Sequence, residues 1–328
     1  MTNQMLSFIN ILSFVGLVTL LTCAYRTFNW VLLYTRPSRL RRFAHPSPNG
    51  EECWALVTGA SDGIGKAFAH ELAANGFNVV LHGRNDAKLH RVVSELQATF
   101  PRRSFRVLVA DASNVADTVH LATGSGSAKF EFLEHLYVTA LINNVGGSVL
   151  SPDYPPLSAT PESSIASNVS LNALFPLHLT RVLLPRLAQN QPSLVLNMST
   201  QASTGQPLNC CYAASKAFLI SLTRGLRLEM FMEGVDVEIL GIQCGRVTGA
   251  AGFTDAPSLF VPSAIRMARA ALARTGYNAG VVTGYIGHSL QLMPLTILPA
   301  WVVDQLFMNI MRRVSEGRFG GGQSRKSR

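Results

Sequence analysis

The sequence predicts an α/β fold with a doubly wound parallel sheet in a single domain. Three observations support this prediction. From residue 53 onward, short apolar strand patterns alternate with helical patterns, which implies parallel strands joined by right-handed crossovers. A glycine-rich turn follows the first strand pattern, and a long charge-free apolar run precedes the domain. The 328 residues leave room for one large domain with extra segments at its ends.

The apolar run covers residues 5–25 and carries no charge. It is long enough to cross a bilayer core of roughly 30 Å. A cleaved signal peptide is the alternative, but no basic residue precedes the run, and the nearby arginines all follow it. The positive-inside rule therefore predicts an uncleaved transmembrane anchor over residues 1–26 with the rest of the chain in the cytosol. Residues 27–50 are basic and proline-containing and read as a linker.

The strand patterns that follow lie at residues 55–57, 78–81, 105–110, 141–142, 194–198 and 237–242. Helical patterns separate them, with apolar residues three or four positions apart, as at residues 86–98. Together they predict one catalytic domain over residues 51–280.

The turn after the first strand pattern reads Thr58-Gly-Ala-Ser-Asp-Gly-Ile-Gly-Lys66. Glycines here let backbone amides approach a pyrophosphate, and the following helix points its positive end at the phosphates. A strand, turn and helix in this order predict a Rossmann-like dinucleotide site. Its expected contacts are Gly59, Ser61, Asp62, Gly63, Ile64 and Gly65.

The second strand pattern ends in Gly83-Arg84, where an NAD site would place an acid for the ribose hydroxyls. An arginine suits a 2′-phosphate instead, with Ser61 and Lys66 as possible helpers. NADPH is therefore the predicted cofactor. The alternative is a solvated arginine at a helix start.

Tyr212 and Lys216 are four residues apart at the start of an apolar-faced helix, so they share one helix face. An ammonium group close to a phenol lowers the phenol's pKa. The pair therefore predicts a tyrosine that donates a proton to a carbonyl oxygen.

The glycine turn, the Asn143-Asn-Val-Gly146 segment and the Tyr212–Lys216 pair together resemble the short-chain dehydrogenase/reductase superfamily over about residues 53–248. The resemblance implies a hydroxyl that polarises the substrate carbonyl. Counting back from Tyr212 indicates Ser199, and aligning the strand pattern indicates Thr200; Ser199 is slightly favoured. It also implies that Asn172 holds a relay water, and that the cofactor contacts include Asp111, Asn144, Gly146, Val247 and Thr248. The family's usual Pro-Gly is replaced by Cys244-Gly245.

The whole layout is similar to the microsomal 3-oxoacyl-CoA reductases and the related membrane-bound 17β-hydroxysteroid dehydrogenases. That similarity implies NADPH-dependent reduction of a 3-oxoacyl-CoA in long- and very-long-chain fatty-acid elongation, at the endoplasmic reticulum membrane and in contact with other elongation enzymes. A steroid, sphingoid or other lipid ketone is an alternative substrate. A weakly catalytic NADP(H)-binding scaffold is an alternative of another class.

Charge and cysteine content limit the other function classes. The net charge is +9, but residues 43–311 carry 17 basic and 18 acidic residues, so the positive charge lies at the two ends. This distribution argues against nucleic-acid binding and favours contact with an anionic membrane surface. Five cysteines with no CxxC pair predict neither a zinc site nor a disulfide framework.

The C-terminal extension, residues 281–328, contains an apolar stretch over residues 290–310. Pro294, Pro299 and Asp304 interrupt it, and two prolines and an acid disfavour a second membrane span. We expect it to lie on the membrane or to cover a lipid-chain channel; a core helix of the domain is the alternative.

Overall fold

The computed structural model describes residues 2–116, 118, 132–150, 153–250 and 253–316. The chain forms two compact units, Met1–Ser38 and Arg39–Arg328. The first unit contains the single helix α1 (Thr2–Thr35). Of the helices in the described part of the chain, α1 alone is long and apolar enough to span a membrane, from Ser7 to Thr35 with a mean hydropathy of 2.0. The helix continues beyond residue 26, so it includes the first part of the predicted linker.

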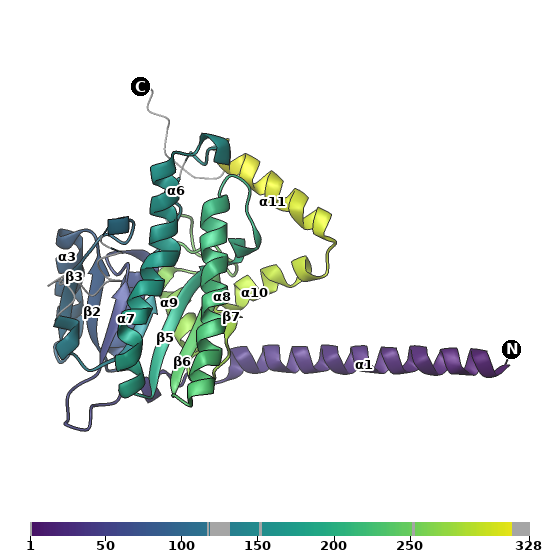
Figure 1. The fold of residues 1–328 in the computed structure, drawn as a ribbon, viewed down its shortest axis with the longest axis horizontal. Helices are drawn as coiled ribbons and strands as arrows, with labels where there is room; N and C mark the ends of the chain where they lie inside the picture. The colour runs from purple at the N-terminus through teal and green to yellow at the C-terminus, as the bar shows by residue number, and fades with distance from the viewer. Residues whose placement is uncertain (1, 117, 119–131, 151–152, 251–252, 317–328) are drawn as a thin grey trace. The chain divides into compact units, whose positions relative to one another are not determined.

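The second unit is built on a seven-stranded sheet in which every pairing is parallel, in the order β3-β2-β1-β4-β5-β6-β7 (Figure 1). This arrangement confirms the predicted Rossmann-like sheet. Its strands are β1 (Trp54–Thr58), β2 (Asn78–Gly83), β3 (Phe105–Val109), β4 (Val138–Asn143), β5 (Ser193–Thr200), β6 (Val237–Cys244) and β7 (Val281–Thr283).

Only β7 had no counterpart among the strand patterns. It is three half-buried residues long and pairs with β6 at the sheet edge. A segment this short has no hydrophobic periodicity to detect.

Helices cover both faces of the sheet, as a doubly wound fold requires. One face carries α2 (Gly63–Ala74), α3 (Asp86–Thr99) and α9 (Ala264–Leu272). The other carries α6 (Glu162–Val169), a π-helical turn (Ser170–Leu174), α7 (Phe175–Gln189) and α8 (Cys210–Glu233), with α7 and α8 crossing in front of the strands in Figure 1.

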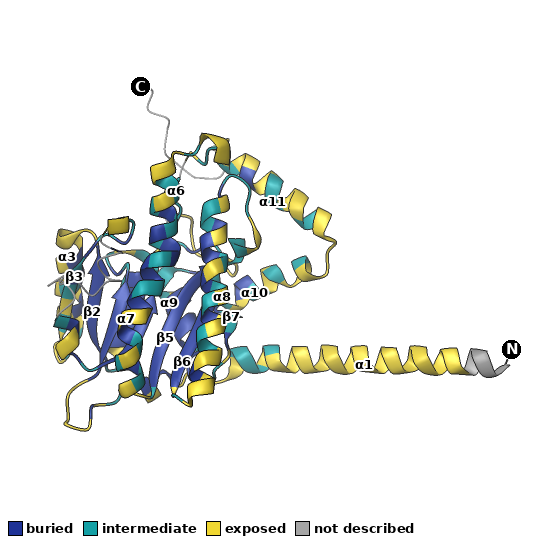
Figure 2. Cartoon of the chain, viewed as in Figure 1, coloured by how far each residue is buried: buried dark blue, intermediate teal, exposed yellow. Residues whose placement is uncertain are grey.

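The two cores follow the alternation of side chains along the strands. In β1, Ala55 and Val57 belong to the core beneath α2 and α9, whereas Leu56 belongs to the core beneath α7. The strands are accordingly the most continuously buried part of the molecule (Figure 2).

The C-terminal half of the predicted linker is part of the domain. In the 3₁₀ turn η1 (Leu40–Phe43), Leu40 and Phe43 are 2% and 0% exposed, because both pack into the main core. The Phe43 carbonyl accepts a hydrogen bond from the Thr139 hydroxyl at 2.7 Å. Arg42 forms an ion pair with Asp236 at 2.5 Å. The chain therefore enters the domain through a fixed segment.

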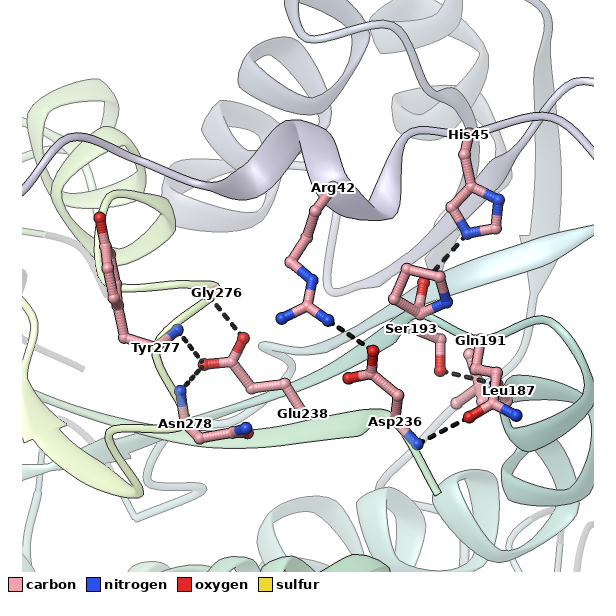
Figure 3. A network of polar contacts seen from close by, with 11 residues as sticks. Arg42, His45, Leu187, Gln191, Ser193, Asp236, Glu238, Gly276, Tyr277 and Asn278 are labelled. Carbon is pink, nitrogen blue, oxygen red and sulfur yellow. Dashed lines mark hydrogen bonds and ion pairs between the residues drawn. The ribbon is translucent and has the colours of Figure 1, made fainter. Parts of the chain in front are cut away.

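A buried carboxylate strengthens this end of the sheet (Figure 3). Glu238 on β6 accepts hydrogen bonds from the backbone N–H groups of Gly276, Tyr277 and Asn278. Burial raises the pKa of the Glu238 carboxyl, while the three backbone donors and Arg42 lower it. The network joins the loop after α9 to the start of β6, away from the strand ends that form the candidate site.

The apolar stretch 290–310 does not form one continuous helix. Helix α10 (Ile286–Leu292) ends just before Pro294, a short 3₁₀ turn (Pro294–Thr296) follows, and α11 (Ala300–Ser315) begins after Pro299. Proline lacks the N–H that continues a helix, so the two prolines separate the segments.

Candidate active site

The glycine-rich turn lies between β1 and α2, as predicted. Asp62 caps α2 by accepting a hydrogen bond from the Gly63 N–H at 2.7 Å, and Ser61 and Ile64 are half-buried beside it. A Cβ at position 65 would lie 2.0 Å from the Gly59 carbonyl oxygen. Because that neighbour is backbone, only glycine fits at position 65, and the turn stays tight.

The ends of β1 and β4 are tied together next to this turn. The Thr58 hydroxyl accepts hydrogen bonds from the Asn144 and Val145 N–H groups, and the Asn144 side chain donates to the Thr58 carbonyl, each at 2.9 Å. Asn144 therefore lies against the glycine turn, and its side chain holds the backbone at the end of β1.

Residues proposed to select the cofactor lie after β2 and β3. Arg84 is exposed at the end of β2, so its guanidinium is available to an anion. Lys66, on α2, instead forms an ion pair with Glu95 at 2.5 Å. The Asp111 carboxylate, half-buried after β3, accepts hydrogen bonds from the Ser113 N–H and hydroxyl. Arg84 is thus the most accessible of these basic groups.

The two hydroxyls that compete for the substrate carbonyl point in different directions. Ser199 is 3% exposed and donates a hydrogen bond to the Lys216 backbone carbonyl at 2.9 Å. The hydroxyl of Thr200, the last residue of β5, accepts a hydrogen bond from the Ala202 N–H at 3.3 Å and lies close enough to the Tyr212 phenol to lower its pKa. The structure therefore brings together Thr200 and Tyr212, whereas sequence counting slightly favoured Ser199.

Tyr212 and Lys216 lie in the first half of α8. The Lys216 ammonium is buried and donates to the Met198 carbonyl at 2.9 Å. Burial lowers the pKa of Lys216 to about 8, and the nearby Cys244 thiol raises it.

Burial raises the pKa of the Tyr212 phenol, Cys244 raises it further, and the nearby Thr200 hydroxyl lowers it. The expectation of a lowered phenol pKa is therefore wrong, because burial outweighs the lowering effect of Thr200. A raised pKa keeps the phenol protonated at neutral pH, as a proton donor requires.

Asn172 lies in the π-helical turn between α6 and α7, with no exposed surface. Its side chain accepts from the Gly147 N–H at 3.0 Å and donates to the Gly147 carbonyl at 2.9 Å. A Cβ on Gly146 would lie 2.6 Å from the Lys216 ammonium nitrogen and 2.8 Å from the Asn172 amide oxygen. A larger residue at position 146 would therefore displace the ends of the Lys216 and Asn172 side chains.

The loop after β6 is held by a residue that the sequence did not single out. His288 on α10 is fully buried; its Nδ1 accepts from the Gly245 N–H at 3.1 Å, and its Nε2 pairs with the Arg246 carbonyl at 3.0 Å. A carbonyl only accepts, so the ring is the neutral Nε2–H tautomer. Burial lowers the pKa of His288. This clamp holds the position where the family's usual Pro-Gly is absent.

Two further side chains near Tyr212 were not predicted. Cys244 ends β6, and its thiol donates to the Ser199 carbonyl at 3.3 Å; burial raises the pKa of that thiol to about 11. Tyr154 also raises the pKa of Tyr212 through its charge. Neither carries a sequence motif, since a lone cysteine and a lone tyrosine are ordinary packing residues.

The arrangement fits a dinucleotide along the carboxyl ends of the strands. Val247 is buried and Thr248 half-buried in the loop after β6. Among the described residues, the Thr248 hydroxyl oxygen is buried with no hydrogen-bond partner. A hydrogen bond from a bound cofactor would satisfy this hydroxyl. No cluster of three or more potential metal ligands occurs in the described ranges.

Comparison with known proteins gives consistent similarities. The family model for short chain dehydrogenases matches residues 53–254. A very-long-chain 3-oxoacyl-CoA reductase of Caenorhabditis elegans is 32% identical over 264 residues, which covers 78% of this chain and 79% of the relative. A very-long-chain 3-oxoacyl-CoA reductase-like protein of Arabidopsis thaliana is 31% identical over 318 residues, covering 93% and 95%.

Among solved structures, a short-chain dehydrogenase from Sphingobium yanoikuyae in complex with NADPH has a TM-score of 0.59 and 21% identity; the match covers 83% of this chain and 98% of that one. At this identity the match supports the fold alone.

Proposed function

Because the chain belongs to the short-chain dehydrogenase family, a family of oxidoreductases, we propose that it reduces the 3-oxo group of a long-chain 3-oxoacyl-CoA with NADPH. The relatives that match most of its length are named very-long-chain 3-oxoacyl-CoA reductases, at 31–34% identity. The observation that carries the proposal is that the Thr200 hydroxyl lies close enough to the Tyr212 phenol to lower its pKa, while the helix that carries Tyr212 also carries the buried Lys216. It supports a site for protonating a carbonyl oxygen.

In the proposed mechanism, the hydroxyls of Tyr212 and Thr200 both donate hydrogen bonds to the 3-oxo oxygen. Tyr212 then transfers its proton to that oxygen as charge develops on it. NADPH, when bound, supplies the hydride to the adjacent carbon. Lys216 contributes positive charge below its pKa of about 8, and Asn172 positions the loop that contains Gly146.

NADPH is proposed over NADH because β2 ends in Gly83 and is followed directly by an exposed arginine, Arg84, so neither position carries an acid. An arginine can bind a 2′-phosphate through two hydrogen bonds, whereas an NAD site uses an acid on the ribose hydroxyls. Ser61, in the glycine-rich turn, would help Arg84 to bind the 2′-phosphate. The glycine turn would hold the pyrophosphate, Asp111 the adenine, and Val247 with Thr248 the nicotinamide side.

The proposed location is the endoplasmic reticulum membrane, with α1 as a single anchor and the catalytic domain in the cytosol. The five arginines on the C-terminal side of the apolar run support this orientation. A membrane location suits a substrate with a long acyl chain, and it would place the enzyme among other fatty-acid elongation enzymes.

The direct test is NADPH oxidation by purified full-length protein in phospholipid nanodiscs, with a 3-oxoacyl-CoA as substrate. We expect formation of the 3-hydroxyacyl-CoA, and a loss of at least about a hundredfold in kcat for Tyr212→Phe. Steroid and sphingoid ketones run in parallel should be poorer substrates. Binding of NADPH without turnover of any ketone would contradict the proposal and favour a scaffold.

A further inference from the structure

The segment between α10 and α11 exposes apolar side chains to solvent. We call residues 293–301 the apolar elbow; every residue in it except Thr296 is apolar. Ile297 is 81% exposed and Trp301 is 71% exposed. No charged side chain occurs between His288 and Asp304. Figure 2 shows α10 and α11 meeting at this exposed corner. Contiguous exposed apolar surface of this kind marks an interaction site.

Helix α11 itself has a different pattern. Its half-buried or buried apolar residues fall in groups three or four positions apart, so this face turns toward the protein; they are Val302, Val303, Phe307, Met308, Met311 and Val314. The outward positions include the exposed polar residues Asp304 and Asn309. The exposed apolar surface is therefore largest at the elbow, and it continues onto α11 at Leu306 and Ile310, which are 41% and 37% exposed.

The two helices that flank the elbow contact loops of the candidate active site. On the α10 side, His288 holds Gly245 and Arg246, and its carbonyl accepts a hydrogen bond from the Gln201 side chain at 2.9 Å. On the α11 side, the sulfur of buried Met311 accepts from the Gln206 side chain at 3.0 Å. Gln201 and Gln206 belong to the segment between Thr200 and Tyr212.

The surface that this elbow would meet follows from the rest of the chain. Residues 36–39 alone separate the end of α1 from η1, a reach of roughly 14 Å when extended. If α1 spans a bilayer, the domain stays tethered beside that bilayer. Apolar side chains can insert into the interface of a bilayer, and tryptophan side chains are enriched at the level of the lipid headgroups.

We propose that the apolar elbow inserts into the bilayer interface and thereby holds the loop after β6 and the segment between Thr200 and Tyr212 close to the membrane. This inference rests on the proposed function for its substrate: a long-chain 3-oxoacyl-CoA, whose acyl chain partitions into lipid. The elbow lets that chain pass from the bilayer to the loops around Tyr212 with little exposure to water. Short, water-soluble 3-oxoacyl-CoA substrates need no such route.

Insertion is tested in full-length protein reconstituted in phosphatidylcholine vesicles with or without bromine on the acyl chains. The chain has three tryptophans, so the emission of Trp301 is the difference between the wild type and Trp301→Phe. We expect that difference signal to be blue-shifted and quenched by the brominated lipid. A red-shifted Trp301 signal that the bromines do not quench would overturn the proposal. A blue-shifted signal that the bromines do not quench would also overturn it, because it would indicate that Trp301 is buried against a second copy of the chain.

The passage of the acyl chain from the bilayer to the active site is tested with the double variant Ile297→Asp and Leu298→Asp, which places two negative charges in the elbow. We expect at least a tenfold fall in kcat/KM for a long-chain 3-oxoacyl-CoA delivered in vesicles, and an unchanged value for acetoacetyl-CoA. The matched control is Phe231→Asp/Met232→Asp, on the exposed end of α8, which should leave both values unchanged.

An equal fall for both substrates, or no fall for the long one, would contradict the elbow's role. If the wild type reduces neither substrate, the proposed function fails, while the tryptophan quenching still decides whether the elbow inserts.

Discussion

Replacing Thr200 by valine removes one hydroxyl while keeping the shape of the side chain. Of the two candidate hydroxyls, that of Thr200 is the one that lowers the pKa of Tyr212, so we expect it to donate to the substrate oxygen as negative charge develops there. Loss of one such donor costs about 10²–10³ in kcat, or about 3–4 kcal/mol of transition-state stabilisation. Thr200→Ser, which keeps the hydroxyl, should recover most of the loss.

Ser199→Ala is the matched comparison on the neighbouring residue. The Ser199 hydroxyl donates to the Lys216 backbone carbonyl at 2.9 Å and is buried, so its loss should lower the free energy of unfolding by about 1 kcal/mol. It should change kcat by less than about threefold, since a purely structural hydrogen bond contributes equally to ground and transition states.

The assay is steady-state oxidation of NADPH with acetoacetyl-CoA, combined with urea denaturation of each variant. A hundredfold loss of kcat in Ser199→Ala with a near-normal Thr200→Val would refute the assignment. It would show that the Ser199 hydroxyl turns toward the substrate when ligands bind.

Three further predictions concern pH and the cofactor turn. Because the pKa of Lys216 is lowered to about 8, kcat/KM should fall as the pH rises above 8 and the ammonium loses its proton; a flat profile to pH 9 in the wild type would contradict this. His82 is buried against the Phe175 ring, and burial lowers its pKa from 6.5 to about 4. The unfolded chain therefore binds a proton before the folded one, so stability should fall by about 3 kcal/mol as the pH drops from 6.5 to 4; His82→Leu should remove this part of the acid sensitivity in urea denaturation. Gly65→Ala places a Cβ against the Gly59 carbonyl and should weaken NADPH binding at least tenfold by fluorescence titration, whereas Gly225→Ala, with no neighbour within 4 Å, should bind normally.

The sequence predicted most of the fold because its signals are local. Six of the seven strands carry a run of apolar or β-branched residues, and the glycine turn has a spacing that few other structures need. What it could not predict depends on contacts between distant residues. Leu40 and Phe43 look like part of a basic linker, and only the folded core shows that they are buried.

The same distinction holds for the candidate site. Tyr212 and Lys216 are recognisable because four residues place them on one helix face. Choosing between Ser199 and Thr200 needs the direction of each side chain, which depends on the packing of β5 against α8. His288 had no motif, since its partners Gly245 and Arg246 are more than forty residues away. The pKa of Tyr212 depends on burial, which spacing does not report.

The most direct test of the central claim is product analysis with full-length protein in nanodiscs, given NADPH and a long-chain 3-oxoacyl-CoA. We predict stoichiometric conversion of one NADPH and one 3-oxoacyl-CoA to the 3-hydroxyacyl-CoA, with the reaction lost in Tyr212→Phe. Unchanged product formation in that variant, or no 3-hydroxyacyl-CoA from the wild type, would contradict the account.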